Sequence, residues 1–130
     1  MREVVETGIP PTKSPLEWAV SADGVLYTAL IATKPDGSLD AGDITAQTTR
    51  TLDNLRQVVD AAGGTMADVN QVLIYLTDAA DAPAMNAVYR TYFDQPFPNR
   101  ATVVISALLA PGAIIEIVAY AHIGKSGSST

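Results

Sequence analysis

Hydrophobic and polar positions divide the chain into short strands and longer amphipathic runs. Near the start, residues 2–6 form a strand candidate, and the runs Trp18–Ala22 and Val25–Ile31 flank the dipeptide Asp23-Gly24. An Asp-Gly pair between two apolar runs is typical of a two-residue hairpin turn. The pattern therefore predicts a β-hairpin, followed by a second turn at Lys34–Ser38.

The clearest helix is predicted to begin near Asp43, a residue type that commonly caps helix N-termini. Small and apolar side chains then recur at three- and four-residue steps at Ile44, Thr48, Leu52, Leu55, Val59 and Ala62. This spacing produces one apolar stripe, and Gly63-Gly64 is a suitable place for the helix to end. We expect the stripe to pack on a sheet.

The second half of the chain predicts a strand at Val69–Asp78 and a helix capped by Asp81, with Pro83 in its first turn. Two strands follow the proline-rich break, at Ala101–Ala107 and Ala113–Ile123. The inner face of the second helix is expected to carry Met85, Val88, Tyr89 and Tyr92. The predicted order is β-β-β-α-β-α-β-β, an α+β fold with a mostly antiparallel sheet.

The last strand is apolar on both faces. One parity consists of Ala113, Ile115, Ile117, Ala119 and Ala121, and the other of Ile114, Glu116, Val118, Tyr120 and His122. An antiparallel sheet with one solvated face should instead alternate between apolar and polar residues. Because the two helices can cover only one face, we predict that another copy of the chain covers the second and that the protein is a homo-oligomer.

Composition limits the kinds of function. A length of 130 residues with 48% hydrophobic and 17% charged residues predicts one folded domain. We assign it to residues 1–123 and expect residues 124–130, GKSGSST, to be a flexible tail. The net charge of -6 and the absence of a basic stripe argue against nucleic-acid binding.

The sequence has no cysteine, no signal-like apolar segment and no run long enough for a membrane helix. We therefore expect a cytoplasmic protein that does not bind membranes. The single histidine, His122, excludes a multi-histidine metal site, and no common nucleotide, metalloprotease or hydrolase motif is present. We expect no metal or organic cofactor.

Arg100 and Glu116 are the most conspicuous charges in apolar surroundings. If the last two strands pair in antiparallel fashion across a tight turn, with Val104 opposite Glu116, Arg100 and Glu116 share one face, roughly 13 Å apart. In a structural interpretation, Arg100 caps a turn and Glu116 lies at a sheet edge. In a functional one, Arg100 binds a carboxylate through its planar fork, and Glu116 holds a water or relays a proton.

Three segments resemble the RidA (YjgF) family of reactive-intermediate deaminases over nearly the whole chain. They read TLDNLRQVVDAAGGTMADVNQVLIYLTD, MNAVYRTYF and PFPNRATVVISALLAPGAIIEIVAYA. The resemblance implies a chorismate-mutase-like fold and a homotrimer with clefts between subunits. It also implies hydrolysis of enamines or imines to keto acids and ammonia without a cofactor.

The resemblance assigns roles to three residues. Arg100 corresponds to the arginine that binds the substrate carboxylate, Glu116 to the glutamate that positions water, and Asn86 to an asparagine near the cleft. Many family members have tyrosine, serine, glycine and cysteine where this chain has Leu16, Ala29, Leu30 and Thr102. Together with Trp18, these substitutions are expected to make the substrate-binding cleft more apolar and differently shaped.

Three functions are compatible with these features. The first is hydrolytic deamination of a small carboxylate-bearing imine or enamine, a reaction of the hydrolases that act on non-peptide C–N bonds. The second is deamination of a larger enamine in a degradation pathway. The third is a non-catalytic trimer that binds small acids or a protein partner. Replacement of the family's tyrosine and serine hydroxyls is the feature that keeps the second and third open.

Overall fold

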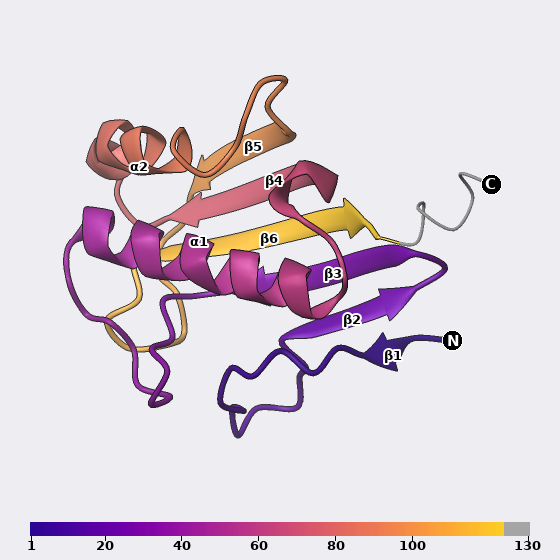
Figure 1. The fold of residues 1–130 in the computed structure, drawn as a ribbon. Helices are drawn as coiled ribbons and strands as arrows, with labels where there is room; N and C mark the ends of the chain where they lie inside the picture. The colour runs from indigo at the N-terminus through magenta and orange to yellow at the C-terminus, as the bar shows by residue number, and fades with distance from the viewer. Residues whose placement is uncertain (124–130) are drawn as a thin grey trace.

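A six-stranded sheet with two helices on one side makes up the described part of the chain, residues 1–123 (Figure 1). The computed structural model contains the helices α1 (Ile44–Ala61) and α2 (Ala82–Tyr89) and the strands β1 (Glu3–Val4), β2 (Ala19–Ala22), β3 (Val25–Leu30), β4 (Val69–Leu76), β5 (Asn99–Val104) and β6 (Ile115–His122). This order confirms the predicted β-β-β-α-β-α-β-β arrangement. The predicted tail, residues 124–130, lies outside the described residues.

The strands lie in the order β1-β2-β3-β6-β4-β5. All neighbours are antiparallel except β4 and β5, which are parallel and connected through α2. The predicted pairing of the last two strands is therefore wrong, because β4 lies between β5 and β6. A helical crossover makes parallel neighbours of β4 and β5, and residues 105–114 form a long connection rather than a tight turn.

Local sequence signals explain the predicted turn and the first helix. Asp23 and Gly24 both adopt positive φ angles, of 52° and 79°, as a type I′ hairpin turn requires. The Asp43 carboxylate accepts a hydrogen bond from the Ala46 backbone N–H at 2.9 Å, which confirms the predicted N-cap. Asp81 occupies the predicted N-cap position of α2, but its side chain forms no capping hydrogen bond, and Asp78 caps the short 3-10 helix Ala79–Asp81 that precedes α2.

The core lies between the sheet and the helices. Leu52, Leu55, Val58 and Val59 of α1 are buried against the sheet side chains Leu26, Leu30, Val72, Ile74, Ile115 and Ile117. Of the predicted inner face of α2, Met85 and Tyr89 are buried, whereas Val88 and Tyr92 are only partly buried. No helix within residues 1–123 is long and apolar enough to cross a membrane.

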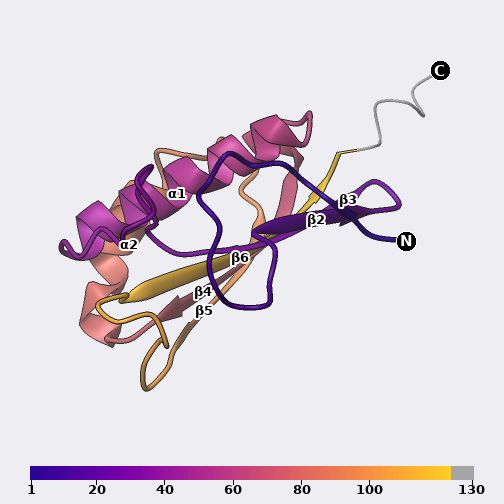
Figure 2. The ribbon, with the colours of Figure 1, turned by 90° about the horizontal axis from the view of Figure 1, so that it is seen from below.

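The opposite face of the sheet carries no helix, as Figure 2 shows. We call it the open face. Tyr27 of β3 and Tyr120 of β6 meet there edge to face, with ring centroids 5.7 Å apart. Tyr27 remains 41% exposed and Val103 of β5 46% exposed. Exposed apolar side chains on a sheet face commonly mark a contact with another molecule.

Candidate functional site

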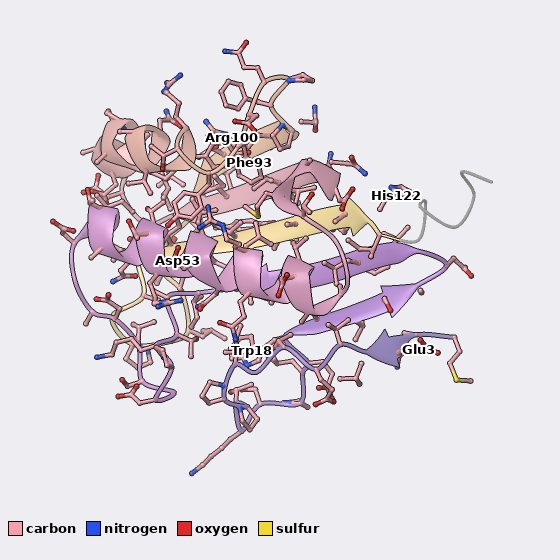
Figure 3. The ribbon with its side chains drawn as sticks, viewed as in Figure 1. Glu3, Trp18, Asp53, Phe93, Arg100 and His122 are labelled. Carbon is pink, nitrogen blue, oxygen red and sulfur yellow. The ribbon has the colours of Figure 1, made fainter. Side chains whose placement is uncertain are left out.

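Arg100 projects from the helix-covered face of the sheet, at its β5 edge. It lies opposite Val72 of β4, whose side chain is buried beneath the helices. The Arg100 guanidinium lies 4.7 Å from the centroid of the Tyr89 ring in α2, within cation–π range. Tyr89 in turn packs on Phe93, with ring centroids 4.7 Å apart. Arg100 thus packs against an aromatic pair of which Figure 3 labels Phe93, close to Arg100.

A cavity of about 250 Å³ opens beside this guanidinium. We call it the arginine cavity, and its walls are Asn86, Tyr89, Arg90, Phe97, Pro98 and Arg100. None of these residues is acidic. A guanidinium that faces a cavity without a carboxylate in its walls can form a bidentate pair with an incoming carboxylate.

The Tyr89 hydroxyl is buried and has no hydrogen-bond partner within the described residues. Burial raises the pKa of Tyr89 and the positive charge of Arg100 opposes this, so the phenol remains neutral at physiological pH. The ring, rather than the hydroxyl, therefore supports Arg100.

We expect Tyr89→Phe to raise the free energy of unfolding by about 1 kcal/mol or leave it unchanged, because it removes an unsatisfied buried hydroxyl. Tyr89→Leu should lower the same quantity by about 2 kcal/mol, because it removes the ring that packs on Phe93 and Arg100. Urea denaturation at one fixed protein concentration measures both changes. If the phenylalanine variant lost as much stability as the leucine variant, the hydroxyl would have a structural role.

Glu116 lies on the open face. It is paired in register with Tyr75 of β4, which is also paired with Val103 of β5. Glu116 is only half-buried, yet burial raises the pKa of its carboxyl group. A carboxylate with a raised pKa is better matched to proton transfer near neutral pH than an ordinary one.

A second cavity, of about 550 Å³, surrounds Glu116. We call it the glutamate cavity. The wall includes Leu16, Trp18 and Ala29, along with the loop residues Ala107, Leu108, Leu109 and Ala110. Most of these side chains are apolar, and the wall also contains two carboxylates, the exposed Glu17 and the half-buried Glu116.

The Gln47 side chain in α1 fixes the loop that leads to Glu116. Its amide donates to the carbonyls of Gly42 and Gly112 and accepts from the backbone N–H of Ile114, at 3.2, 2.9 and 3.0 Å. These bonds satisfy a buried polar side chain and fix the entry into β6. The position of Glu116 is therefore set from the helix layer.

Arg100 and Glu116 lie on opposite faces of the sheet in one chain. Val103 shares the open face with Glu116, and Arg100 stands three residues earlier on a strand whose side chains alternate. The predicted same-face arrangement is wrong, because it rested on direct pairing of β5 with β6. Each chain thus presents two separate cavities, the arginine cavity and the glutamate cavity, which are candidate half-sites.

The other residues chosen from the sequence divide between the two half-sites. Asn86 lines the arginine cavity, and Thr102 lies on the same face of β5 as Arg100 without reaching the cavity wall. Leu16, Trp18 and Ala29 line the glutamate cavity. Figure 3 shows Trp18 beside the N-terminal segment and Arg100 at the other side of the domain.

Two of these residues have clear structural constraints. The Trp18 indole N–H donates to the Pro10 carbonyl at 2.8 Å, which fixes the ring at the edge of the cavity. Leu30 borders the glutamate cavity, but its side chain is only 1% exposed and belongs to the core. Ala29, by contrast, is exposed on the open face, and the parts of Leu30 and Ala29 in shaping the cleft stay predictions.

Sequence reasoning missed two residues that define the arginine cavity, Tyr89 as a platform and Arg90 as a second cation. Together with Asn86 they have the i, i+3 and i+4 spacing of one helix face, with Arg90 at the C-cap of α2. That spacing was visible in the sequence. In the described part of the chain, no three His, Asp or Glu side chains gather in a way that could hold a metal ion.

The fold defines a class of small α+β proteins in which two helices cover one face of a mostly antiparallel sheet. The sequence model of the family described as "Endoribonuclease L-PSP" matches residues 9–123. The chain therefore belongs to this family, which is the RidA (YjgF) family of the sequence resemblance.

Individual relatives agree with this assignment. The chain is 35% identical over 122 residues to 3-aminoacrylate deaminase RutC of Acinetobacter baylyi, covering 92% of this chain and 96% of that protein. The structure of YyfA, a Rid-family protein of Yersinia pestis, superposes with a TM-score of 0.88 at 33% identity, over 95% and 100% of the two chains.

A ligand-bound structure is also similar. TdcF of E. coli, solved with bound serine, matches with a TM-score of 0.84 at 27% identity, over 92% of this chain and 98% of that one. Together these similarities confirm the predicted fold class and the family.

Proposed function

We propose that this protein hydrolyses a carboxylate-bearing enamine or imine to a keto acid and ammonia, without a cofactor. The observation that carries this proposal is the Arg100 guanidinium, held 4.7 Å over the Tyr89 ring beside a cavity with no acidic wall residue. The similarity to a 3-aminoacrylate deaminase and to a family member crystallised with serine supports a small amino-acid-derived substrate.

The complete site requires two copies of the chain. Arg100 with Asn86 would bind the substrate carboxylate, and Glu116 of a neighbouring copy would act at the reacting carbon. The exposed apolar open face provides a surface on which copies can associate, and a closed ring of three would form three equivalent clefts. We therefore keep the homotrimer as part of the proposal.

The reaction needs little from the protein. An enamine first gains a proton on carbon and loses one from nitrogen to become an imine. Glu116 accepts a proton from water as the water oxygen bonds to the imine carbon, and the imine nitrogen is protonated. The tetrahedral intermediate then loses its hydroxyl proton and gains a proton on nitrogen, so that ammonia leaves as the C–N bond breaks and the C=O bond of the keto acid forms. The protein contributes orientation, charge complementarity and proton transfer.

The glutamate cavity, of about 550 Å³, leaves room for a substrate with a substituent larger than a methyl group. Leu16 is 51% exposed and Leu109 is fully exposed at its rim. Many family members have tyrosine at the position of Leu16, so this chain offers an apolar surface where they offer a hydroxyl. This observation supports the second candidate function, which is deamination of an enamine with more than three carbon atoms.

The family description also names an endoribonuclease. RNA binding depends on neutralising many phosphates, and the chain has 8 Lys and Arg against 14 Asp and Glu. The arginine cavity holds only two of these cations. The charge balance therefore favours the deaminase activity.

We expect the purified protein to accelerate keto-acid formation from imines that an amino-acid oxidase releases in the same cuvette. Keto acid is measured in the presence of semicarbazide, which competes for the free imine. Imines derived from alanine and from leucine compare a small with a larger apolar substituent. A rate equal to that of buffer with every imine tested would contradict the proposed function.

A further inference from the structure

Arg90 is a second cation in the wall of the arginine cavity. It follows Tyr89 directly, and its backbone N–H donates to the carbonyl of Asn86 at 3.0 Å, one helical turn earlier. Asn86 and Arg90 therefore lie on the same side of α2, the side that faces the cavity. The cavity is thus bordered by Arg90, the residue that caps the C-terminus of α2, and by Arg100 of β5.

Two arginines in the wall of one cavity of about 250 Å³ create a local positive potential that attracts an anion. None of the six wall residues is a carboxylate that could neutralise either of them. The chain as a whole has a net charge of -6, so this local excess of positive charge opposes the background. A monocarboxylate bound at Arg100 would leave Arg90 without an anionic group of the ligand to bind.

We infer that Arg90 is a specificity-determining residue that binds a second anionic group, so that the preferred substrate is the imine or enamine of a dicarboxylic amino acid. This inference rests on the proposed function for the reaction, but its binding step can be measured separately. Arg100 binds the carboxylate next to the reacting carbon, and Arg90 binds the distal one. An apolar substituent in the same direction would be disfavoured.

The binding test uses calorimetry with two stable probes, succinate and propionate, which have similar carbon skeletons and differ in charge. We expect wild type to bind succinate about tenfold more tightly than propionate, the value of one charge-assisted hydrogen bond. Arg90→Gln should reduce this ratio to about one while propionate affinity stays within about twofold. Arg90→Lys should keep part of the ratio. Arg100→Gln should weaken both probes.

Arg2→Gln is the matched control, since it makes the same change in net charge at β1, the opposite edge of the sheet from β5. It should leave the ratio unchanged. A helix-stabilising role for Arg90 at the end of α2 would lower the melting temperature of Arg90→Gln without moving the ratio, and would overturn the inference. Equal affinity of wild type for the two probes would also overturn it.

Turnover separates the inference from the proposed function. The oxidase assay is repeated with imines from aspartate and from alanine, and the selectivity is the ratio of the two kcat/KM values. Turnover without preference for the aspartate-derived imine overturns only the inference. A succinate preference that depends on Arg90, in a protein without turnover, overturns only the deaminase function and supports Arg90 as an anion-binding residue.

Discussion

Arg100→Ala is expected to reduce keto-acid formation to the rate in buffer. The guanidinium can form two parallel charge-assisted hydrogen bonds with a carboxylate, each contributing about 1.5–3 kcal/mol. Their removal should weaken carboxylate binding by at least about 100-fold. The variant also leaves the Tyr89 ring without its cation–π partner. The measurements are the initial rate in the oxidase assay and calorimetric binding of propionate.

Arg56→Ala is a closely matched control for Arg100→Ala. The Arg56 guanidinium also lies 4.7 Å from a tyrosine ring, that of Tyr92, but Arg56 does not line the arginine cavity. Its loss should therefore affect stability and leave turnover unchanged. Arg100→Lys tests the geometry, because lysine keeps the charge without the planar fork, and we expect it to recover at most a small part of the activity. An Arg100→Ala variant that folds and retains wild-type turnover would exclude Arg100 from the site.

The elements of the fold followed from local signals that are strong in this chain. Asp23-Gly24 has few alternatives to a hairpin turn, and the stripe from Ile44 to Val59 has the spacing of a helix with one buried face. These signals depend on residues close together in the sequence. That is why the order of strands and helices could be predicted without the structure.

The position of β5 could not be predicted in the same way. Pairing of β5 with β6 and pairing of β5 with β4 place the same apolar residues in a sheet, and local periodicity does not distinguish them. The crossover through α2 decides which strand β5 pairs with, because it returns the chain to the sheet edge next to β4. One wrong neighbour was enough to put Arg100 on the wrong face, because side chains alternate along the strand.

For the site, the sequence identified the charged groups through the family resemblance but not their arrangement. Arg100 and Asn86 do border one cavity and Glu116 another, although their roles stay predictions. The platform of Tyr89 depends on α2 packing over β5, a tertiary contact. Burial of Leu30 likewise follows from the register of β3 with β6, in which Leu30 pairs with the buried Ile117.

The division into half-sites predicts that two inactive variants restore activity when their subunits are mixed. Arg100→Ala retains a complete glutamate cavity, and Glu116→Gln retains a complete arginine cavity. In a cyclic trimer of random composition from equal amounts, about a quarter of the clefts would combine the two intact halves. We therefore expect co-expressed variants to recover about a quarter of wild-type activity, whereas each alone, or the two mixed without subunit exchange, stays near the buffer rate.

A mixture of Arg100→Ala with Asn86→Ala is the control that makes this result specific. Both residues belong to the arginine cavity of one chain, so no combination of these subunits contains an intact half-site of that kind. This pair should show no recovery beyond the activity of its members. Light scattering should give about three times the 13.6 kDa chain mass for every variant. Arg100 and Glu116 lie on opposite faces of one chain, so the proposed cleft needs two subunits. A stable monomer, or mixed trimers of the first pair without recovered activity, would contradict this shared cleft.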